Sequence, residues 1–267
     1  YYYRLIRREK FDIVHTHEAK ASLIGRVAAW LAGCPVIVFG LHGVMYNDPV
    51  FSPKKRRLFI WLERLTVWPS EVVVSVSKSC VEHYHNDGIG KNIPTEIVYS
   101  GIDVDRFATE SALTPEDRTT ERARLGFGPE DVVLVNVGRF TFGKAQRYTI
   151  EAFASLKHKH PNLKLLLVGE GDLQPECRKQ VEELGLQNDV VFYGFTDNIP
   201  RVMSLADINV LTSLREGLPR VVVEASLCGL PTAAFEVEGI REIITDGESG
   251  FVVPQHDVPA LANRLEQ

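Results

Sequence analysis

Two glutamates on either side of a Gly-Leu-Pro turn are the side chains of this chain best suited to chemistry. Glu216 precedes the turn, and Glu224 lies in the apolar run Val-Val-Val-Glu-Ala-Ser-Leu-Cys that follows it. That run predicts a buried helix from Arg220 that stops at Gly229, because Pro219 suits a helix start and glycine suits a helix end. Glu224 would then lie about a turn and a half into the helix, within reach of a ligand at its N-terminal end.

The turn itself predicts an anion site. The amides of Gly217, Leu218 and the first helical turn have no intrahelical partner, and a helix N-terminus carries partial positive charge beside Pro219. A diphosphate or a developing oxyanion would be favoured there. Two carboxylates beside such a site indicate a ligand that also presents hydroxyl donors, and a sugar nucleotide has both kinds of group.

A second candidate element follows a strongly apolar run. Arg139 and Lys144 lie in the segment Asn-Val-Gly-Arg-Phe-Thr-Phe-Gly-Lys, with Gly138 directly before the arginine. Cations just past a strand end can neutralise a diphosphate, the arginine by a planar fork and the lysine as a mobile point charge. A solvated pair on a surface loop is the alternative.

Composition indicates an ordinary globular protein. The chain has 267 residues, 45% of them hydrophobic and 24% charged, with a formal net charge of −5. The length suffices for two domains, and the mild acidity argues against general nucleic-acid binding. The cysteines are dispersed without a C-x-x-C pair, so buried reduced thiols of a cytosolic protein are expected rather than disulfides or a metal site.

Strand-like and helix-like segments alternate along the whole chain, which predicts parallel sheets covered by helices. The predicted strands are 11–17, 35–41, 71–77, 96–100, 131–137, 163–168, 190–193, 208–212 and 232–237. Helical periodicity is clear in 19–31, 146–156 and 173–184. The polar, irregular interval 108–129 is the expected domain boundary, which gives domains 1–110 and 111–267 with ligand in the cleft between them.

These motifs resemble the glycosyltransferase family 4 pattern of retaining GT-B enzymes. The stretch from Ser213 to Pro231 follows the E-x7-E signature S-x-x-E-G-x-P-x-x-x-x-E-A-x-A-x-G-x-P, departing at Ser226. The Arg139 segment is similar to the family's G-R-x-x-x-x-K-G, departing at Ala145. The resemblance implies an α/β GT-B fold of two Rossmann-like doubly wound domains, the first incomplete. It also implies an earlier βαβ region and a closing helix, so we expect truncation at both ends.

The resemblance also implies the site. Arg139 and Lys144 would hold the donor pyrophosphate, Glu216 the sugar hydroxyls and Glu224 the ribose hydroxyls. His42, in Gly-Leu-His-Gly where the family has T-x-H-G, would lie beneath the transferred sugar. The loop from Gly194 and Phe195 to Pro200 resembles the one whose backbone contacts the nucleotide base. No cofactor or metal is implied, and the nucleotide diphosphate sugar is itself the donor substrate.

Several other patterns have plainer interpretations. His15-Thr-His17 suggests metal only weakly, and the glycines of Gly169-Glu-Gly171 indicate a tight turn rather than a dinucleotide fingerprint. Asp103-Val-Asp105 matches the family's G-I-D-x-x-R-F rather than a metal-binding D-x-D. Lys20 and Arg26 are expected to be acceptor-side or surface charges.

The segment Lys54–Trp61 predicts a basic, aromatic-rich helix. It could lie on an anionic membrane or form a solvated face with a core-facing aromatic stripe.

We therefore expect a cytoplasmic, metal-independent hexosyltransferase that retains anomeric configuration and acts on an acceptor sugar or lipid-linked sugar. Peripheral contact at the inner membrane face is a further expectation, and so is a role in cell-surface polysaccharide or glycolipid assembly. Two alternatives stay open. One is a sugar-nucleotide-binding module without catalysis; the other is a related GT-B epimerase or phosphorylase.

Overall fold

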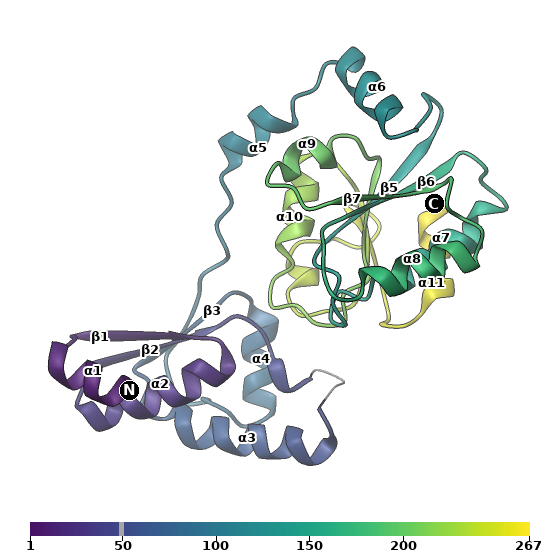
Figure 1. Cartoon of the computed structure of the whole chain (residues 1–267). Coiled ribbons are helices and arrows are strands. Elements are labelled where there is room, and N and C mark those ends of the chain that lie inside the picture. The colour runs from purple at the N-terminus through teal and green to yellow at the C-terminus, as the bar shows by residue number, and fades with distance from the viewer. Residues whose placement is uncertain (48–50) are drawn as a thin grey trace. The chain divides into compact units, whose positions relative to one another are not determined.

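The computed structural model describes residues 1–47 and 51–267, except for the side chains of Ala19 and Lys20. The expectation for Lys20 therefore lies outside the described residues. Two compact units share the chain (Figure 1). The first comprises Tyr1–Ser100 with Arg215–Leu218, and the second comprises Gly101–Leu214 with Pro219–Gln267.

The first unit holds a parallel sheet whose strand order is β1-β2-β3-β4. Its strands are β1 (Ile13–His17), β2 (Val36–Leu41), β3 (Val72–Ser75) and β4 (Thr95–Ile97). Its helices are α1 (Tyr2–Glu9), α2 (Ala19–Ala32), α3 (Pro53–Val67) and α4 (Lys78–Asn86), with the short 3-10 turn η1 (Met45–Asn47) after β2. Each predicted strand of this half is present, and α2 matches its predicted range within a residue.

The second unit holds a parallel sheet in the order β10-β9-β8-β5-β6-β7. Its strands are β5 (Val132–Val137), β6 (Leu163–Val168), β7 (Val190–Gly194), β8 (Ile208–Leu211), β9 (Thr232–Phe235) and β10 (Gly250–Val253). Its helices are α5 (Val104–Ser111), α6 (Pro115–Arg124), α7 (Gln146–Lys157), α8 (Gln174–Glu183), α9 (Ile199–Met203), α10 (Arg220–Leu227) and α11 (Val258–Leu265), with η2 (Ile240–Glu242). The order reverses between β5 and β8, which makes that point the switch point of a doubly wound sheet.

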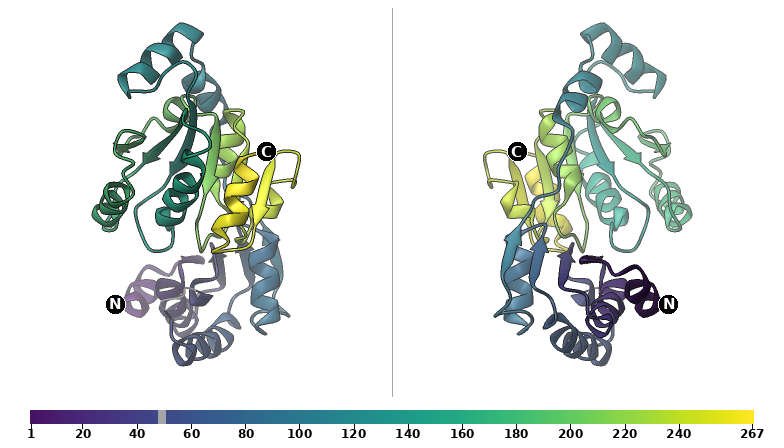
Figure 2. Two further views of the ribbon diagram at one scale, coloured as in Figure 1. Left: turned by 90° about the vertical axis from the view of Figure 1, so that its right-hand side faces the viewer. Right: turned by 90° about the vertical axis from the view of Figure 1, so that its left-hand side faces the viewer.

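Alternation along the strands of the second unit builds a core on each face of the sheet. On β6, Leu165 and Leu167 pack into the cluster that includes residues of α7, α8 and α11. Leu166 and Val168 pack into the opposite cluster, with residues of α9 and α10. The period of two places successive side chains on opposite faces, and helices cover both (Figure 2). This layering confirms the predicted α/β class.

The polar interval 108–129 is more ordered than its composition predicts. Thr114 caps α6 by accepting a hydrogen bond from the amide of Asp117, directly before Pro115 at the first helical turn. The prediction of an irregular stretch was wrong here, because a capping residue, a proline and acidic residues together start a helix without apolar periodicity.

Asp207 anchors α6 to the second unit. Its carboxylate accepts hydrogen bonds from Arg118 at 2.7 Å, from the backbone amide of Val133 at 2.7 Å and from Arg122 at 3.3 Å. Arg118 also donates to the carbonyl of Ser204. The charge pairs, rather than an apolar face, hold this helix.

The two units divide at Ser100/Gly101, ten residues before the predicted 110/111. The helix α5 packs against α9, so residues after Gly101 group with the second unit. Asp103 begins α5 as its N-cap, accepting a hydrogen bond from the amide of Arg106 at 3.0 Å. The first carboxylate of the Asp-Val-Asp sequence therefore caps a helix.

Arg26 is buried, so the prediction of a surface or acceptor-side charge was wrong. Its guanidinium donates to Glu63 at 2.6 Å and to Thr66 at 3.1 Å, and it lies 4.1 Å from the ring centroid of Phe39. Both charged side chains are almost completely shielded from solvent. Burial raises the pKa of the Glu63 carboxyl, and the adjacent Arg26 lowers it only in part. No local sequence pattern indicated this pair, because its members lie on different helices.

Candidate active site

Three loops after β5, β6 and β7 are joined by backbone hydrogen bonds beyond the ends of the strands. The amide of Gly138 donates to the carbonyl of Val168 at 2.9 Å, and the amide of Phe140 to that of Glu170 at 2.9 Å. The amide of Gly169 donates to the carbonyl of Gly194 at 2.8 Å. These bonds hold the loops at one edge of the sheet, next to the switch point where doubly wound folds bind ligands.

The loops can approach this closely because two of their residues have no side chain. A Cβ on Gly169 would overlap the carbonyl oxygen of Gly138, and one on Gly171 would overlap that of Phe140. Gly169 also has φ of +124°, a backbone conformation that other residues rarely adopt. The predicted tight turn thus has a further purpose, which is to bring two loop backbones into contact.

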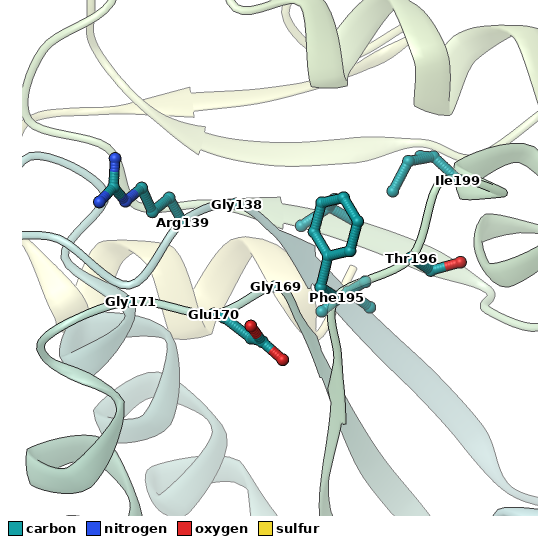
Figure 3. A pocket seen from close by; sticks show the side chains of 10 residues that line it. Gly138, Arg139, Gly169, Glu170, Gly171, Phe195, Thr196 and Ile199 are labelled. Atoms are coloured by element: carbon teal, nitrogen blue, oxygen red, sulfur yellow. The ribbon is translucent and has the colours of Figure 1, made fainter.

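A pocket of about 540 Å³ opens at these loops. Its lining comes from the ends of β5, β6 and β7: Val137, Gly138, Arg139, Val168, Gly169, Glu170, Gly171, Phe195, Thr196 and Ile199. Figure 3 shows the guanidinium of Arg139 at one end, with the ring of Phe195 and the side chain of Ile199 at the other. A cation at one end and an apolar surface at the other suit a ligand that joins an anion to a flat ring.

Part of this lining was predicted from the sequence. Gly138, Arg139, Gly194 and Phe195 were candidates, and the pocket includes all of them except Gly194, which ends β7 beside it. Phe195 is 68% exposed, so its ring is accessible to a ligand in the pocket. Thr196 and Ile199 lie in the loop 194–200 that was predicted to contact the base, although neither was named as a site residue. Glu170 was missed, and its signal was its position directly after β6, which neighbours β5 in the sheet.

Lys144 lies close to Gly138, in the loop between β5 and α7. A Cβ on Gly138 would be 3.4 Å from the Cδ of Lys144, so the glycine leaves room for the aliphatic part of the lysine. The next residue, Ala145, adopts a left-handed conformation with φ of 47°. Glycine would adopt that conformation freely, whereas alanine does so at a cost of roughly 1–2 kcal/mol. The backbone at Ala145 therefore has the left-handed conformation that glycine, the usual residue at this position of the resembled motif, adopts most easily.

Glu224 occupies the predicted helix, which begins at Arg220 as expected. Its carboxylate lies 3.9 Å from the guanidinium of Arg220 and is mostly shielded from solvent. Burial raises the pKa of Glu224, while the positive charges of Arg220 and Lys144 lower it in part. The structure thus brings Lys144 and Glu224, from two separate motifs, close enough to interact electrostatically.

The remaining candidates belong to the first unit. His42 follows β2 with its ring exposed, and its Nε2 lies 2.7 Å from Nδ1 of His17. Glu216, Gly217 and Leu218 group with the first unit, whereas Pro219 groups with the second. The predicted site residues are therefore divided between the units.

Comparison with known proteins gives matches to two sequence families. Residues 117–267 match the family described as glycosyl transferases group 1, and residues 1–106 match glycosyltransferase family 4. EpsD of Bacillus subtilis, named as a glycosyltransferase, is 33% identical over 99% of this chain and 69% of its own length. An Escherichia coli protein named UDP-Gal:alpha-D-GlcNAc-diphosphoundecaprenol alpha-1,3-galactosyltransferase is 27% identical over 98% of this chain and 67% of its own.

A solved structure shows the same architecture. Anabaena Alr3699/HepE in complex with UDP-glucose superposes with a TM-score of 0.83 at 26% identity, covering 99% of this chain and 70% of that one. The same protein has also been solved with UDP and glucose, at a TM-score of 0.83. These similarities confirm the GT-B fold class and the resemblance predicted from the motifs.

The close contact between Gly169 and the Gly138 carbonyl predicts how a substitution of Gly169 changes the stability of the protein. Gly169→Ala would force a Cβ into the Gly138 carbonyl and strain the backbone, so we expect a loss of about 2–4 kcal/mol in the free energy of unfolding. Gly143→Ala is the matched control, because no atom lies within 4 Å of the added Cβ. Urea unfolding of both variants measures the difference. Equal stability of the two would contradict the proposed importance of the close approach.

Proposed function

Because the chain belongs to the glycosyl transferases of group 1, we propose that its donor is a UDP-sugar and that it transfers the hexosyl group to an acceptor hydroxyl with retention of configuration. The observation that carries the proposal is the pocket of the second unit, with Arg139 at one end and Phe195 at the other. Its dimensions and its two chemically different ends suit a nucleoside diphosphate. Alr3699/HepE, which has the same fold, is solved with UDP and with UDP-glucose.

In this proposal the two ends of the pocket bind different parts of the donor. The uracil would lie against Phe195 and the backbone of its loop, and the diphosphate would lie toward Arg139 and Lys144. Glu224 would accept hydrogen bonds from the ribose hydroxyls, since it is mostly shielded from solvent and two cations offset the effect of its burial only in part. The amides of Gly217 and Leu218, before Pro219, would add donors for the sugar or phosphate.

The proposed transfer step assigns a role to each of these residues. The bond between the anomeric carbon and the diphosphate oxygen breaks, and the electron pair leaves with the UDP, whose charge Arg139 and Lys144 stabilise. The acceptor oxygen bonds to the same face of the oxocarbenium-like sugar, and its proton passes to the departing phosphate. Glu216 and His42 would hold the sugar hydroxyls during this step. None of these roles requires a metal ion or a cofactor.

Nucleotide titration tests the donor site. We expect UDP to bind in preference to GDP and ADP, with no effect of EDTA, in isothermal titration calorimetry. Arg139→Ala and Glu224→Ala should each weaken UDP binding about 10–100-fold, because each removes a charge-assisted hydrogen bond of about 1.5–3 kcal/mol. Arg124→Ala and Glu183→Ala are matched controls on exposed helix positions of the same unit. Unchanged affinity in the site variants would refute the assignment.

Stereochemistry tests the reaction. With an α-linked UDP-hexose and water as the acceptor, we expect the α-hexose to appear first, before mutarotation, in time-resolved proton NMR. Release of the β-hexose would contradict retention. UDP binding without any turnover would favour the non-catalytic module, and a changed hexose on recovered UDP-sugar would favour an epimerase.

We also propose that the first unit contacts an anionic membrane through α3, where a lipid-linked acceptor would reside. Leu58, Trp61 and Leu65 are 53%, 55% and 48% exposed. They lie on one helix face with Lys54 and Arg57, since these positions are three or four residues apart. The predicted alternative, a core-facing stripe, was wrong for Trp61, although Phe59 and Ile60 do pack against the core. Within residues 1–47 and 51–267, no helix combines the length and the hydrophobicity of a membrane-spanning segment.

Vesicle binding tests this surface. Sedimentation with vesicles rich in phosphatidylglycerol should exceed that with phosphatidylcholine alone. Lys54→Gln combined with Arg57→Gln should lower the partition constant roughly tenfold or more, at about 1 kcal/mol for each cation. Trp61→Ser with Leu65→Ser should do the same, whereas Leu184→Ser, an exposed leucine of the second unit, should not. Equal binding to both vesicle types would overturn the proposal.

A further inference from the structure

Three histidines of the first unit gather at the carboxyl ends of β1 and β2. His15 and His17 are two residues apart on β1, so their side chains share one face of the sheet. The ring centroids of His15 and His17 are 4.0 Å apart, and those of His17 and His42 are 5.0 Å apart. His17 pairs in register with Gly40 of β2, two residues before His42.

Gly40 leaves the space that this arrangement needs. A Cβ at that position would lie 2.6 Å from Nδ1 of His17 and 3.1 Å from Nε2 of His15. A Cβ almost never approaches another heavy atom to 2.6 Å, so any larger residue would displace the ring of His17. A threonine, which the resembled pattern has at this position, would meet the same overlap with the ring of His17.

The contact between His17 and His42 is a hydrogen bond between imidazoles. Nδ1 of His17 lies 2.7 Å from Nε2 of His42, so one of the two nitrogens carries the shared proton and the other accepts it. The tautomer of a histidine is set by the hydrogen bond that one of its nitrogens makes. With Nε2 engaged, Nδ1 is the nitrogen of His42 that remains for a ligand, and its role as donor or acceptor is coupled to the tautomer of His17.

We propose that His17 is a positioning residue, which holds the exposed ring of His42 in one orientation and one tautomer for contact with the transferred sugar. This inference rests on the proposed function, in which His42 hydrogen-bonds a sugar hydroxyl. An exposed imidazole otherwise samples several rotamers, and fixing it beforehand lowers the entropic cost of binding in the transition state. His17 itself need not touch the substrate.

Paired substitutions at His17 test the proposal. His17→Leu removes the hydrogen bond, whereas the amide of His17→Asn can place a polar atom near the position of Nδ1. With a UDP-hexose that the parent protein uses as donor, we expect kcat of His17→Leu to be lower than that of the parent by about 10-fold or more. Its affinity for UDP should stay within about twofold of the parent. His17→Asn should recover most of kcat. The proposal would be overturned if kcat of His17→Asn were no higher than that of His17→Leu, or if His17→Leu kept the kcat of the parent.

Two further measurements keep the test independent of folding and of catalysis. Gly40→Ala changes neither histidine but displaces His17, so it should lower kcat as His17→Leu does. Imidazole ¹⁵N chemical shifts, with His42 assigned by His42→Gln, should show one tautomer in the parent and a mixture in His17→Leu. An unchanged tautomer of His42 would refute the positioning role. Failure of the parent to bind UDP would instead count against the proposed function.

Discussion

The close approach of two loop backbones after β5 and β6 is the contact on which the ligand pocket depends. Gly169 and Gly171 lie against the carbonyl groups of Gly138 and Phe140, where no Cβ fits. Because the loops are then joined by backbone hydrogen bonds, Arg139 is carried at the pocket edge by a fixed main chain. In the proposed reaction, a cation on such a scaffold would stabilise the leaving diphosphate without first having to be ordered.

Charge has two different uses in this molecule. Arg26 with Glu63, and Asp207 with Arg118 and Arg122, hold helices in place and are already paired within the protein. Removal of one member of a buried pair leaves the other charge uncompensated, so such pairs tolerate little change. Arg139 differs, because its guanidinium lies at the edge of an open pocket. A diphosphate would give that charge a partner.

Glu224 is a mostly buried carboxylate whose charge is compensated only in part within the protein. Burial raises its pKa, which means that the folded protein holds this carboxylate at some cost in stability at neutral pH. The cost is partly offset by Arg220 and Lys144, and hydroxyl donors from a ligand would offset more of it. This chain is a glycosyltransferase of GT-B architecture, and a site that is incompletely satisfied without its ligand is consistent with that activity.

The sequence by itself determined most of the strands, part of the helices and the identity of the motifs. The strands from β1 to β9, the start of α10 at Arg220 and the turn at Gly169 followed from period-two alternation, apolar runs and the backbone preferences of proline and glycine. Each of these signals is local, acting over a few residues. The strand β10 was missed because its apolar run is short, and α6 because capping and ion pairs replace an apolar face.

Only the tertiary structure decided which residues meet. The register of β1 against β2 places His17 beside Gly40 and brings it to His42, 25 positions later in the chain. Parallel packing of β5, β6 and β7 collects Arg139, Glu170 and Phe195 around one pocket. Arg26 looked like a surface charge until α2 and α3 packed together and buried it against Glu63. Contacts between distant segments depend on register and packing, which no local pattern in the sequence encodes.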